Sequence, residues 1–177
     1  ADHLKKHLPK DYSTTAHILL DSLGPEIGND ADTGDGTFYY MPYGMYVMQE
    51  GLAEKDFELS MKLLYEITKR FTSEFAIRPF LEKYPELTLK KLTVWVKDKN
   101  HHVRRLVSEG TRPRLPWASR LVEFQKNPKP ALKLLEQLKE DPSLYVRRSV
   151  ANHLNDIAKD HPKLVLTTLK KWKKIKN

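Results

Sequence analysis

Apolar residues recur every three or four positions along most of the chain, which is the spacing of a helix face. The clearest stripe follows Asp56, a residue type that caps helices, and consists of Leu59, Leu63, Leu64 and Ile67. No segment shows a credible strand pattern. The pattern therefore predicts an all-α protein.

Capping and turn residues divide the beginning of the chain. Ser13 is predicted to cap a helix that runs to Leu23, where Gly24 and Pro25 stop it. Residues 26–37, rich in Gly, Asp and Asn, are predicted to form a loop. One helix and one long loop thus precede the aromatic segment that follows.

Prolines shape the later helices. Residues 38–51 are aromatic and apolar but contain Pro42 and Gly44, which predicts a short irregular helix. A helix that starts at Ser73 is predicted to bend at Pro79. Further helices are predicted from Pro85, near 101–109, and over 117–125, 129–139, 143–160 and 162–174.

The segment Val-Arg-Arg-x-Val occurs twice, at residues 103–107 and 146–150, each time five positions after an aspartate. These aspartates, Asp98 and Asp141, lie 43 positions apart, and the helix-opening prolines before them repeat at the same interval. This period is typical of HEAT repeats, whose helix pairs must stack to bury their apolar faces. The chain is therefore predicted to form one domain over residues 1–177, a HEAT-like helical-repeat solenoid with a basic concave face.

Composition fits a protein that binds a polyanion. The formal net charge of +8 favours phosphate-bearing partners. The absence of cysteine excludes disulfides and cysteine metal sites and agrees with a reducing compartment. No apolar run approaches the roughly 20 residues that span a bilayer, and no signal-peptide pattern opens the chain. We therefore expect a cytoplasmic protein with no membrane partner.

The earlier repeat contains an insertion. From Val103 to the next helix-opening proline, Pro128, is 25 positions, whereas from Val146 to Pro162 is 16. The nine extra residues fall around 109–117, a stretch with two prolines, two arginines and one tryptophan. Loops held rigid on a scaffold often carry function, so this insertion is a candidate functional segment.

Metal and cofactor motifs fail when their spacing is checked. The acidic segment that begins at Asp30 suggests a calcium loop, but its sixth position is Asp35 and its twelfth is Met41, in place of the required glycine and glutamate. His101 and His102 are adjacent rather than four positions apart, which argues against zinc. We predict no metal and no cofactor.

Three long runs carry a resemblance to a known family. They are FTSEFAIRPF at 71–80, HVRRLVSEGTRPRLPW at 102–117 and LYVRRSVANHLNDIAKDHP at 144–162. These runs resemble the AlkC-type DNA alkylation-repair glycosylases, and the likeness covers roughly residues 23–172. It implies a HEAT-like fold and hydrolytic removal of N3-alkylated bases, chiefly 3-methyladenine and also 3-methylcytosine, from double-stranded DNA by a monomeric enzyme. Family members carry further helices before Ala1 and another helical unit after Asn177.

The chemistry of such a reaction calls for carboxylates. A base alkylated at N3 is cationic, so the enzyme must stabilise positive charge on the sugar and place a water, and carboxylates do both. The resemblance implies that Glu74 and Asp156 are these catalytic residues. By sequence alone, Glu74 is equally an ordinary acid of a first helical turn, and Asp156 a solvated helix residue.

Trp117 is the third predicted catalytic residue. An indole face attracts a cation by up to about 2 kcal/mol when desolvated, roughly 30-fold in affinity. The alternative is a core tryptophan, as expected for Trp95 and Trp172. Trp117 differs from these because it follows a proline inside the insertion.

Arginines of the two repeats are candidate DNA contacts. Arg105, Arg112 and Arg114 are predicted to reach DNA, since arginine binds phosphate bidentately and enters a narrow minor groove. N3 of adenine lies in that groove. The resemblance links Arg105 and Arg112 to groove insertion and implies no deep base-flipping pocket. Arg148 and Lys159 are predicted phosphate contacts, although any single basic residue is equally a solvated one.

The repeats also contain basic residues expected to be structural. Arg104 and Arg147 are predicted to form ion pairs with the aspartates that start each repeat.

Two functions remain open. One is a glycosylase in which Glu74 and Asp156 meet beside Trp117 at the bottom of one electropositive trough. The other is a non-catalytic helical-repeat module that binds nucleic acid or a protein through the same surface.

Overall fold

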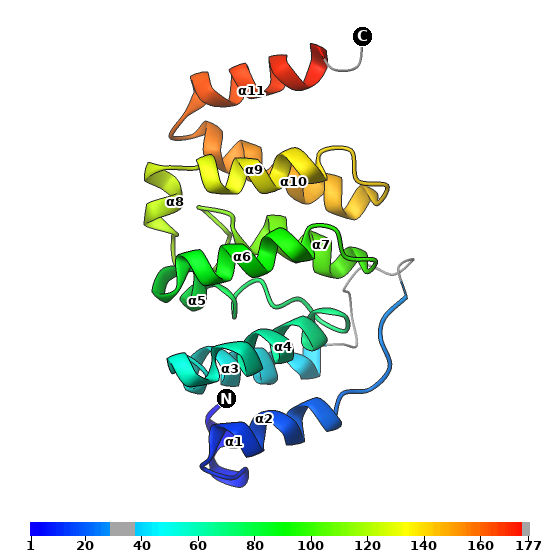
Figure 1. Ribbon diagram of the computed structural model, residues 1–177, viewed down its shortest axis with the longest axis vertical. Helices are drawn as coiled ribbons and strands as arrows, with labels where there is room; N and C mark the ends of the chain where they lie inside the picture. The colour runs from blue at the N-terminus through cyan, green and yellow to red at the C-terminus, as the bar shows by residue number, and fades with distance from the viewer. Residues whose placement is uncertain (29–37, 175–177) are drawn as a thin grey trace.

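The computed structural model describes residues 1–28 and 38–174, and in this part of the chain every regular element is a helix, without a strand. Figure 1 shows the helices stacked along one long axis, with the C-terminus at one end of the stack. The helices are α1 Asp2–His7, α2 Tyr12–Asp21, α3 Met41–Glu50, α4 Phe57–Thr68, α5 Arg78–Lys83, α6 Pro85–Trp95, α7 His101–Gly110, α8 Val122–Lys126, α9 Lys129–Leu138, α10 Leu144–Ala158 and α11 Pro162–Lys174. Short 3-10 turns, Phe38–Tyr40 and Glu54–Asp56, precede α3 and α4. The predicted all-α class is confirmed.

The 43-residue period corresponds to two helix pairs, α6 with α7 and α9 with α10. Helix α7 begins at His101 and α10 at Leu144, and Pro85 opens α6 as Pro128 caps α9. Helix α7 packs against α10, α9, α6 and α4, so it lies at the centre of the stack. The helical-repeat architecture predicted from the period is thus confirmed.

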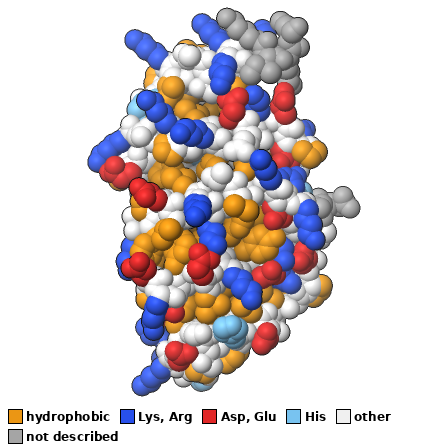
Figure 2. Space-filling view, viewed as in Figure 1, with side chains coloured by type: hydrophobic (Ala, Val, Ile, Leu, Met, Phe, Trp, Pro, Cys, Tyr) orange, Lys and Arg blue, Asp and Glu red, His pale blue; other side chains and the backbone are white. Residues whose placement is uncertain are grey.

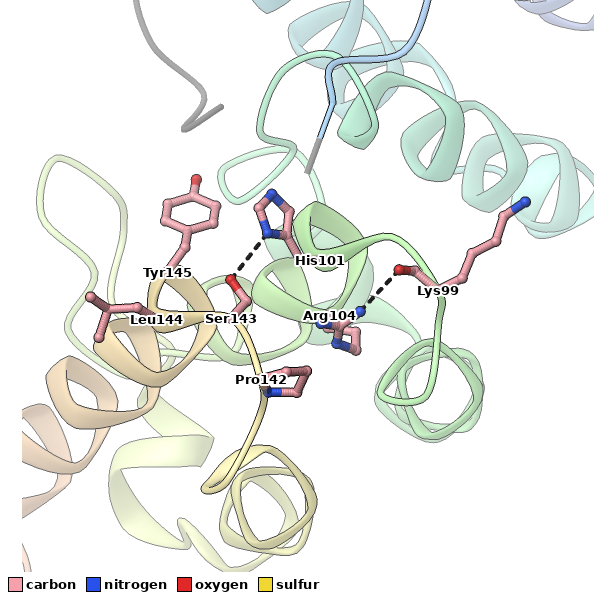
Figure 3. A pocket seen from close by; sticks show the side chains of 7 residues that line it. All are labelled: Lys99, His101, Arg104, Pro142, Ser143, Leu144 and Tyr145. Carbon is pink, nitrogen blue, oxygen red and sulfur yellow. Dashed lines mark hydrogen bonds between the residues drawn. The ribbon is translucent and has the colours of Figure 1, made fainter. Parts of the chain in front are cut away.

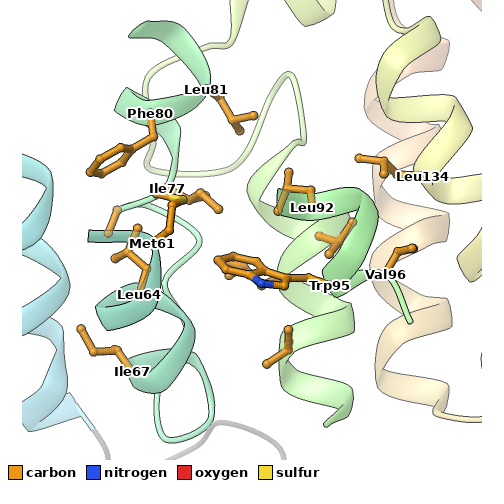
Figure 4. Packing of buried hydrophobic residues seen from close by; sticks show 14 of the residues in the cluster. Met61, Leu64, Ile67, Ile77, Phe80, Leu81, Leu92, Trp95, Val96 and Leu134 are labelled. Carbon is orange, nitrogen blue, oxygen red and sulfur yellow. The ribbon is translucent and has the colours of Figure 1, made fainter. Parts of the chain in front are cut away.

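One hydrophobic core runs through these layers. Figure 4 shows Met61, Leu64 and Ile67 of α4 and Leu92 and Trp95 of α6, which belong to this one cluster. All five side chains are buried, and the same cluster continues into the later repeat. Burial of each large aliphatic side chain contributes about 1.5–3 kcal/mol, so the stacking itself is the main source of stability. Trp95 is in the core as predicted, whereas Trp172 is only partly buried against it.

Two predicted helix starts, at Ser13 and at Ser73, were wrong. Helix α2 is capped by Asp11, whose carboxylate accepts a hydrogen bond from the Thr14 amide at 2.8 Å, and not by Ser13. It ends at Asp21, two residues before the predicted end. Pro42 and Pro79 both fall in first helical turns, where a proline needs no partner for its nitrogen. Helix α3 is therefore regular, and α5 starts at Arg78 rather than bending there.

The insertion also departs from the predicted helix over 117–125. Residues 117–121 are not helical, and α8 covers only Val122–Lys126. Of the predicted loop at 26–37, residues 26–28 are described and run beside the end of α4, where the Ile27 amide donates to the Lys69 carbonyl at 2.9 Å. The acidic segment from Asp30, considered above as a calcium loop, lies outside the described residues.

An ion pair joins the two repeats. Arg104 of α7 donates to both carboxylate oxygens of Asp141, at 2.6 and 2.8 Å, and to the Asp98 carbonyl at 2.8 Å. The predicted structural role of Arg104 is confirmed. Arg147 instead donates to the backbone carbonyls of Asp141 and Pro142, so its predicted ion pair was wrong: it closes the turn before α10 by capping carbonyl groups.

The surface carries both charges. Figure 2 shows Lys and Arg side chains on this face lying among Asp, Glu and apolar side chains over most of the stack. Among the residues that the structure describes, no helix is both long and apolar enough to cross a membrane.

Replacement of Arg104 by alanine is expected to loosen the joint between the repeats. It would leave the Asp141 carboxylate buried without its guanidinium partner, which costs about 3–5 kcal/mol. Urea unfolding measures this free energy. The exposed pair of Lys126 and Glu123 is the control, since Lys126→Ala should change stability by less than about 0.5 kcal/mol. Equal effects of the two substitutions would contradict a structural role for Arg104.

Candidate functional site

Five side chains of alternating charge form a continuous chain at the C-terminal end of α7. In spatial order they are Glu74, Arg105, Glu109, Arg112 and Asp156. They come from the loop before α5, from α7, from the segment after α7 and from α10. Two of the predicted catalytic residues are thereby brought into one site, although they lie 82 positions apart in the sequence.

Glu74 is placed by the loop that joins α4 to α5. The Thr72 hydroxyl donates to the Glu74 carboxylate at 2.9 Å and accepts from the Glu74 amide at 3.3 Å, which closes a small turn. The Ser73 hydroxyl anchors the same loop to the Leu64 carbonyl of α4 at 3.1 Å. Glu74 is therefore in a turn before a helix and not within one, and its carboxylate pairs with Arg105.

Asp156 projects from the buried side of α10. Only 2% of the residue is exposed, so the expectation of a solvated helix position is wrong. Its carboxylate accepts from Nε of Arg112 at 2.8 Å, and Nζ of Lys159 lies 3.7 Å away. Lys159, the residue that follows the end of α10, is itself exposed.

Glu109 is the central carboxylate of the chain. It accepts from Arg112 at 2.6 Å and from the Ser149 hydroxyl at 2.5 Å, and Nη2 of Arg105 lies 3.4 Å from it. Burial by itself would raise the pKa of this carboxyl, but Arg105, Ser149 and Arg112 outweigh burial and hold the pKa below its ordinary value. Glu109 is therefore ionised across the physiological range.

Arg105 and Arg112 are both largely buried among acidic and aromatic side chains. The guanidinium of Arg105 lies 5.0 Å from the ring centre of Tyr145, and burial is outweighed by Glu74 and Glu109, which raise the Arg105 pKa. Only 15% of the Arg105 side chain and 10% of the Arg112 side chain are exposed. Both predicted DNA contacts are thus engaged by carboxylates in this structure.

Arg78 anchors the inserted segment through hydrogen bonds to its backbone. It is the first residue of α5, is almost fully buried, and donates to the backbone carbonyls of Gly110, Arg112 and Ser119. Burial lowers the pKa of the Arg78 guanidinium to about 10, which leaves it charged at neutral pH. One cation thus ties the start and the end of the inserted segment to the loop that carries Glu74.

Gly110 allows the end of α7 to approach that loop. A Cβ at this position would lie 2.7 Å from the Cγ2 methyl of Ile77, closer than any packed pair of carbon atoms. The absence of a side chain therefore decides how near Glu109 and Glu74 can come.

Trp117 is the most exposed large apolar residue of the described chain, at 98%. Its φ of 62° is in the left-handed region, an uncommon conformation for a bulky residue that marks a constrained position. The expectation of a core tryptophan is therefore excluded. The indole edges a hollow of about 420 Å³ lined mainly by Met41, Met45, Met48, Phe75, Arg78 and Pro79.

Both Trp117 and Phe75, the residue after Glu74, line this hollow. Glu74 and Asp156 thus share one ion-pair network, of which Trp117 is not a member, and the meeting of all three residues in one trough stays a prediction.

The other predicted DNA contacts differ in environment. Arg114 pairs bidentately with Asp160 of the segment after α10, at 2.9 and 2.7 Å. Arg148 is exposed on α10. Sequence reasoning missed Glu109 and Arg78. Glu109 could have been found, because it lies four positions after Arg105 and three before Arg112, the spacings at which helical side chains meet. Arg78 gave no such signal.

A larger hollow, about 530 Å³, lies between the starts of α7 and α10. Figure 3 shows Tyr145 and His101 beside it, with the His101 ring bonded to the Ser143 hydroxyl and Arg104 bonded to the Lys99 carbonyl. None of its lining residues is a carboxylate. In the described part of the chain, no group of three His, Cys, Asp or Glu side chains is arranged to hold a metal ion.

Comparison with known proteins assigns the chain to a family. The profile of a family described as "DNA alkylation repair enzyme" matches residues 49–176, most of the chain and all five members of the ion-pair chain. The chain belongs to the DNA alkylation repair enzyme family. This agrees with the resemblance inferred from the three sequence runs.

Two solved structures are similar to this chain, and one of them contains DNA. The alkylpurine DNA glycosylase AlkC of Pseudomonas fluorescens, solved bound to DNA containing an abasic site analog, is 43% identical and superposes with a TM-score of 0.81 over 93% of this chain and 43% of AlkC. The protein smu.31 of Streptococcus mutans UA159 is 27% identical, with a TM-score of 0.55 over 96% of this chain and 90% of that one.

A curated relative is the "Uncharacterized protein YhaZ" of Bacillus subtilis (strain 168), which is 50% identical over 169 residues, 96% of this chain and 44% of YhaZ. The chain therefore spans less than half the length of both YhaZ and AlkC.

Gly110→Ala is expected to destabilise the packing of α7 against the Glu74 loop. The added methyl would force α7 and the Glu74 loop apart, at a cost of about 1–3 kcal/mol measured by urea unfolding. Gly44→Ala is the matched control, because its Cβ would meet Ala76 at 3.4 Å and a helical alanine stabilises by about 0.5–1 kcal/mol. Equal stability of the two variants would refute the close approach.

His153 of α10 makes stability depend on pH. It is fully buried, its Nδ1 donates to the Ser108 carbonyl at 2.9 Å, and burial lowers its pKa from 6.5 to about 4. The unfolded chain therefore binds a proton that the native state excludes. The stability from neutral His153 is complete above pH 6.5 and is lost as the pH falls to about 4, by about 3 kcal/mol in all.

His153→Asn, which keeps a donor near the Nδ1 position, isolates this effect. The unfolding free energy of each protein is measured at several pH values. The difference between wild type and variant should shrink by about 3 kcal/mol from pH 6.5 to pH 4, because only wild type loses this stability. Parallel curves would show that His153 is not held neutral.

Proposed function

We propose that this protein is a DNA glycosylase that hydrolyses the N-glycosidic bond of N3-alkylated bases in double-stranded DNA. The observation that supports this most directly is the joining of Glu74 and Asp156, from elements distant in sequence, into one buried ion-pair network. Membership of the DNA alkylation repair enzyme family and the likeness to the alkylpurine DNA glycosylase AlkC point the same way. Substrates are 3-methyladenine and also 3-methylcytosine.

In the proposed reaction, the two carboxylates act on the sugar. An N3-alkylated base already carries positive charge, so it departs without protonation, and the barrier lies in the cation that forms at the sugar. Glu74 and Asp156 stabilise this charge, and one of them orients the attacking water. Trp117 binds the cationic base or sugar by its π face, which its nearly complete exposure permits.

DNA binding in this proposal uses the arginines beside the carboxylates. Arg105 and Arg112 turn some of their N–H groups from their carboxylate partners to the DNA backbone or the minor groove, which partly uncovers Glu74 and Asp156 as the duplex docks. Arg114, Arg148 and Lys159 add phosphate contacts on a basic concave face. The proposed enzyme works as a cytoplasmic monomer without metal or cofactor.

The test is release of 3-methyladenine from methylated duplex DNA. Wild type should release the base, and Glu74→Gln and Asp156→Asn should each lower the single-turnover rate by about 100-fold, the scale of losing one electrostatic stabiliser. Trp117→Ala should lower it by about 30-fold or less.

Glu58→Gln is the matched control, because Glu58 is exposed and pairs with Lys91 on helices away from the site. Its rate should equal that of wild type. A folded wild-type protein that binds duplex DNA but releases no base would support the non-catalytic module instead and would end the proposal for this chain.

A further inference from the structure

We propose that Glu109 is a positioning residue that holds Arg105 and Arg112 in place between Glu74 and Asp156. This rests on the proposed function, in which the outer two carboxylates act on the substrate. Glu109 would act only through the two arginines, without touching DNA itself.

The geometry sets Glu109 apart from the other carboxylates. Oε1 of Glu109 lies 2.6 Å from Nη1 of Arg112 and 3.4 Å from Nη2 of Arg105, so one oxygen serves both guanidinium groups. Oε2 accepts from the Ser149 hydroxyl of α10 at 2.5 Å. Glu74 and Asp156 each pair with only one of the two arginines. Among the residues that the structure describes, Glu109 is therefore the one that pairs with both arginines and links the two halves of the site.

Electrostatics explains why such a link is needed. Two guanidinium groups near one oxygen repel each other, and with little exposed surface their charge is poorly screened by water. Glu109 offsets this repulsion and has 5% of its own surface exposed, so it is fixed by its partners rather than by solvent.

The proposal has a consequence for catalysis. With three carboxylates and two arginines in the chain, neither Glu74 nor Asp156 receives the full charge of its arginine. Without Glu109, Arg105 would turn wholly to Glu74 and Arg112 wholly to Asp156. Each outer carboxylate would then be neutralised more completely and would stabilise a cationic sugar less well.

Glu109→Gln tests this, because it keeps the size and removes the charge. Base release in single turnover should fall by about 10-fold or more, whereas affinity for a duplex containing an abasic-site analog should stay equal or rise, since a negative charge near DNA is lost. A merely structural role would lower the unfolding midpoint and weaken both activities together. Glu58→Gln should match wild type in both measurements.

Ser149→Ala provides a milder second variant in case Glu109→Gln does not fold. It removes the hydrogen bond to Oε2 but leaves the charge, so excision should fall by only about 2- to 5-fold, with unchanged affinity. Unchanged excision in a folded Ser149→Ala protein, with Glu109→Gln unfolded, would count against the proposal.

A binding cycle separates this inference from the proposed function. Glu109→Gln and Arg112→Lys, singly and together, are compared for affinity to the abasic-site duplex, a measurement that needs no catalysis. If Glu109 positions Arg112, the two effects should differ from additivity by about 3-fold or more. Additive effects overturn the positioning role even if base release is observed. Non-additive effects without base release sustain it while the glycosylase proposal fails.

Discussion

Burial of Arg105 and Arg112 beside a shared carboxylate is the constraint around which the site is built. Two guanidinium groups with little solvent around them are stable only when acids surround them. Here those acids come from the loop before α5, from α7 and from α10. The ion pairs between these acids and the two arginines therefore fix the positions of the three elements relative to one another. Displacing any of them would leave a buried charge without a partner, which costs more than the loss of a surface pair.

This network depends on the stacking of the repeats. Helix α7 packs against α10 along its length, and His153 and Ser149 of α10 bond to Ser108 and Glu109 of α7. The inserted segment is held by Arg78, whose guanidinium binds carbonyl groups at both of its ends. The ion-pair chain is thus held in place by several layers of the stack, because its residues come from more than one helix pair.

In the proposed enzyme, the same ion pairs connect binding to chemistry. Carboxylates close to a polyanion repel it, and arginines next to them offset that repulsion. Phosphate groups are the natural competitors for such arginines. DNA would therefore compete with Glu74 and Asp156 for Arg105 and Arg112, and the carboxylates would become available only where a duplex is docked.

The sequence by itself determined the helical class, the 43-residue repeat, the family and the pairing of Arg104 with an aspartate, because periodicity, prolines and local motifs express these directly. It also singled out Glu74 and Asp156 as catalytic candidates through their motif. Only the tertiary structure decided that Glu109 joins them, that Arg78 is buried and that Trp117 stands exposed outside the network. The reason is physical: these properties depend on which helices stack and on how closely Gly110 lets them approach, and contacts between distant segments leave no period in the sequence.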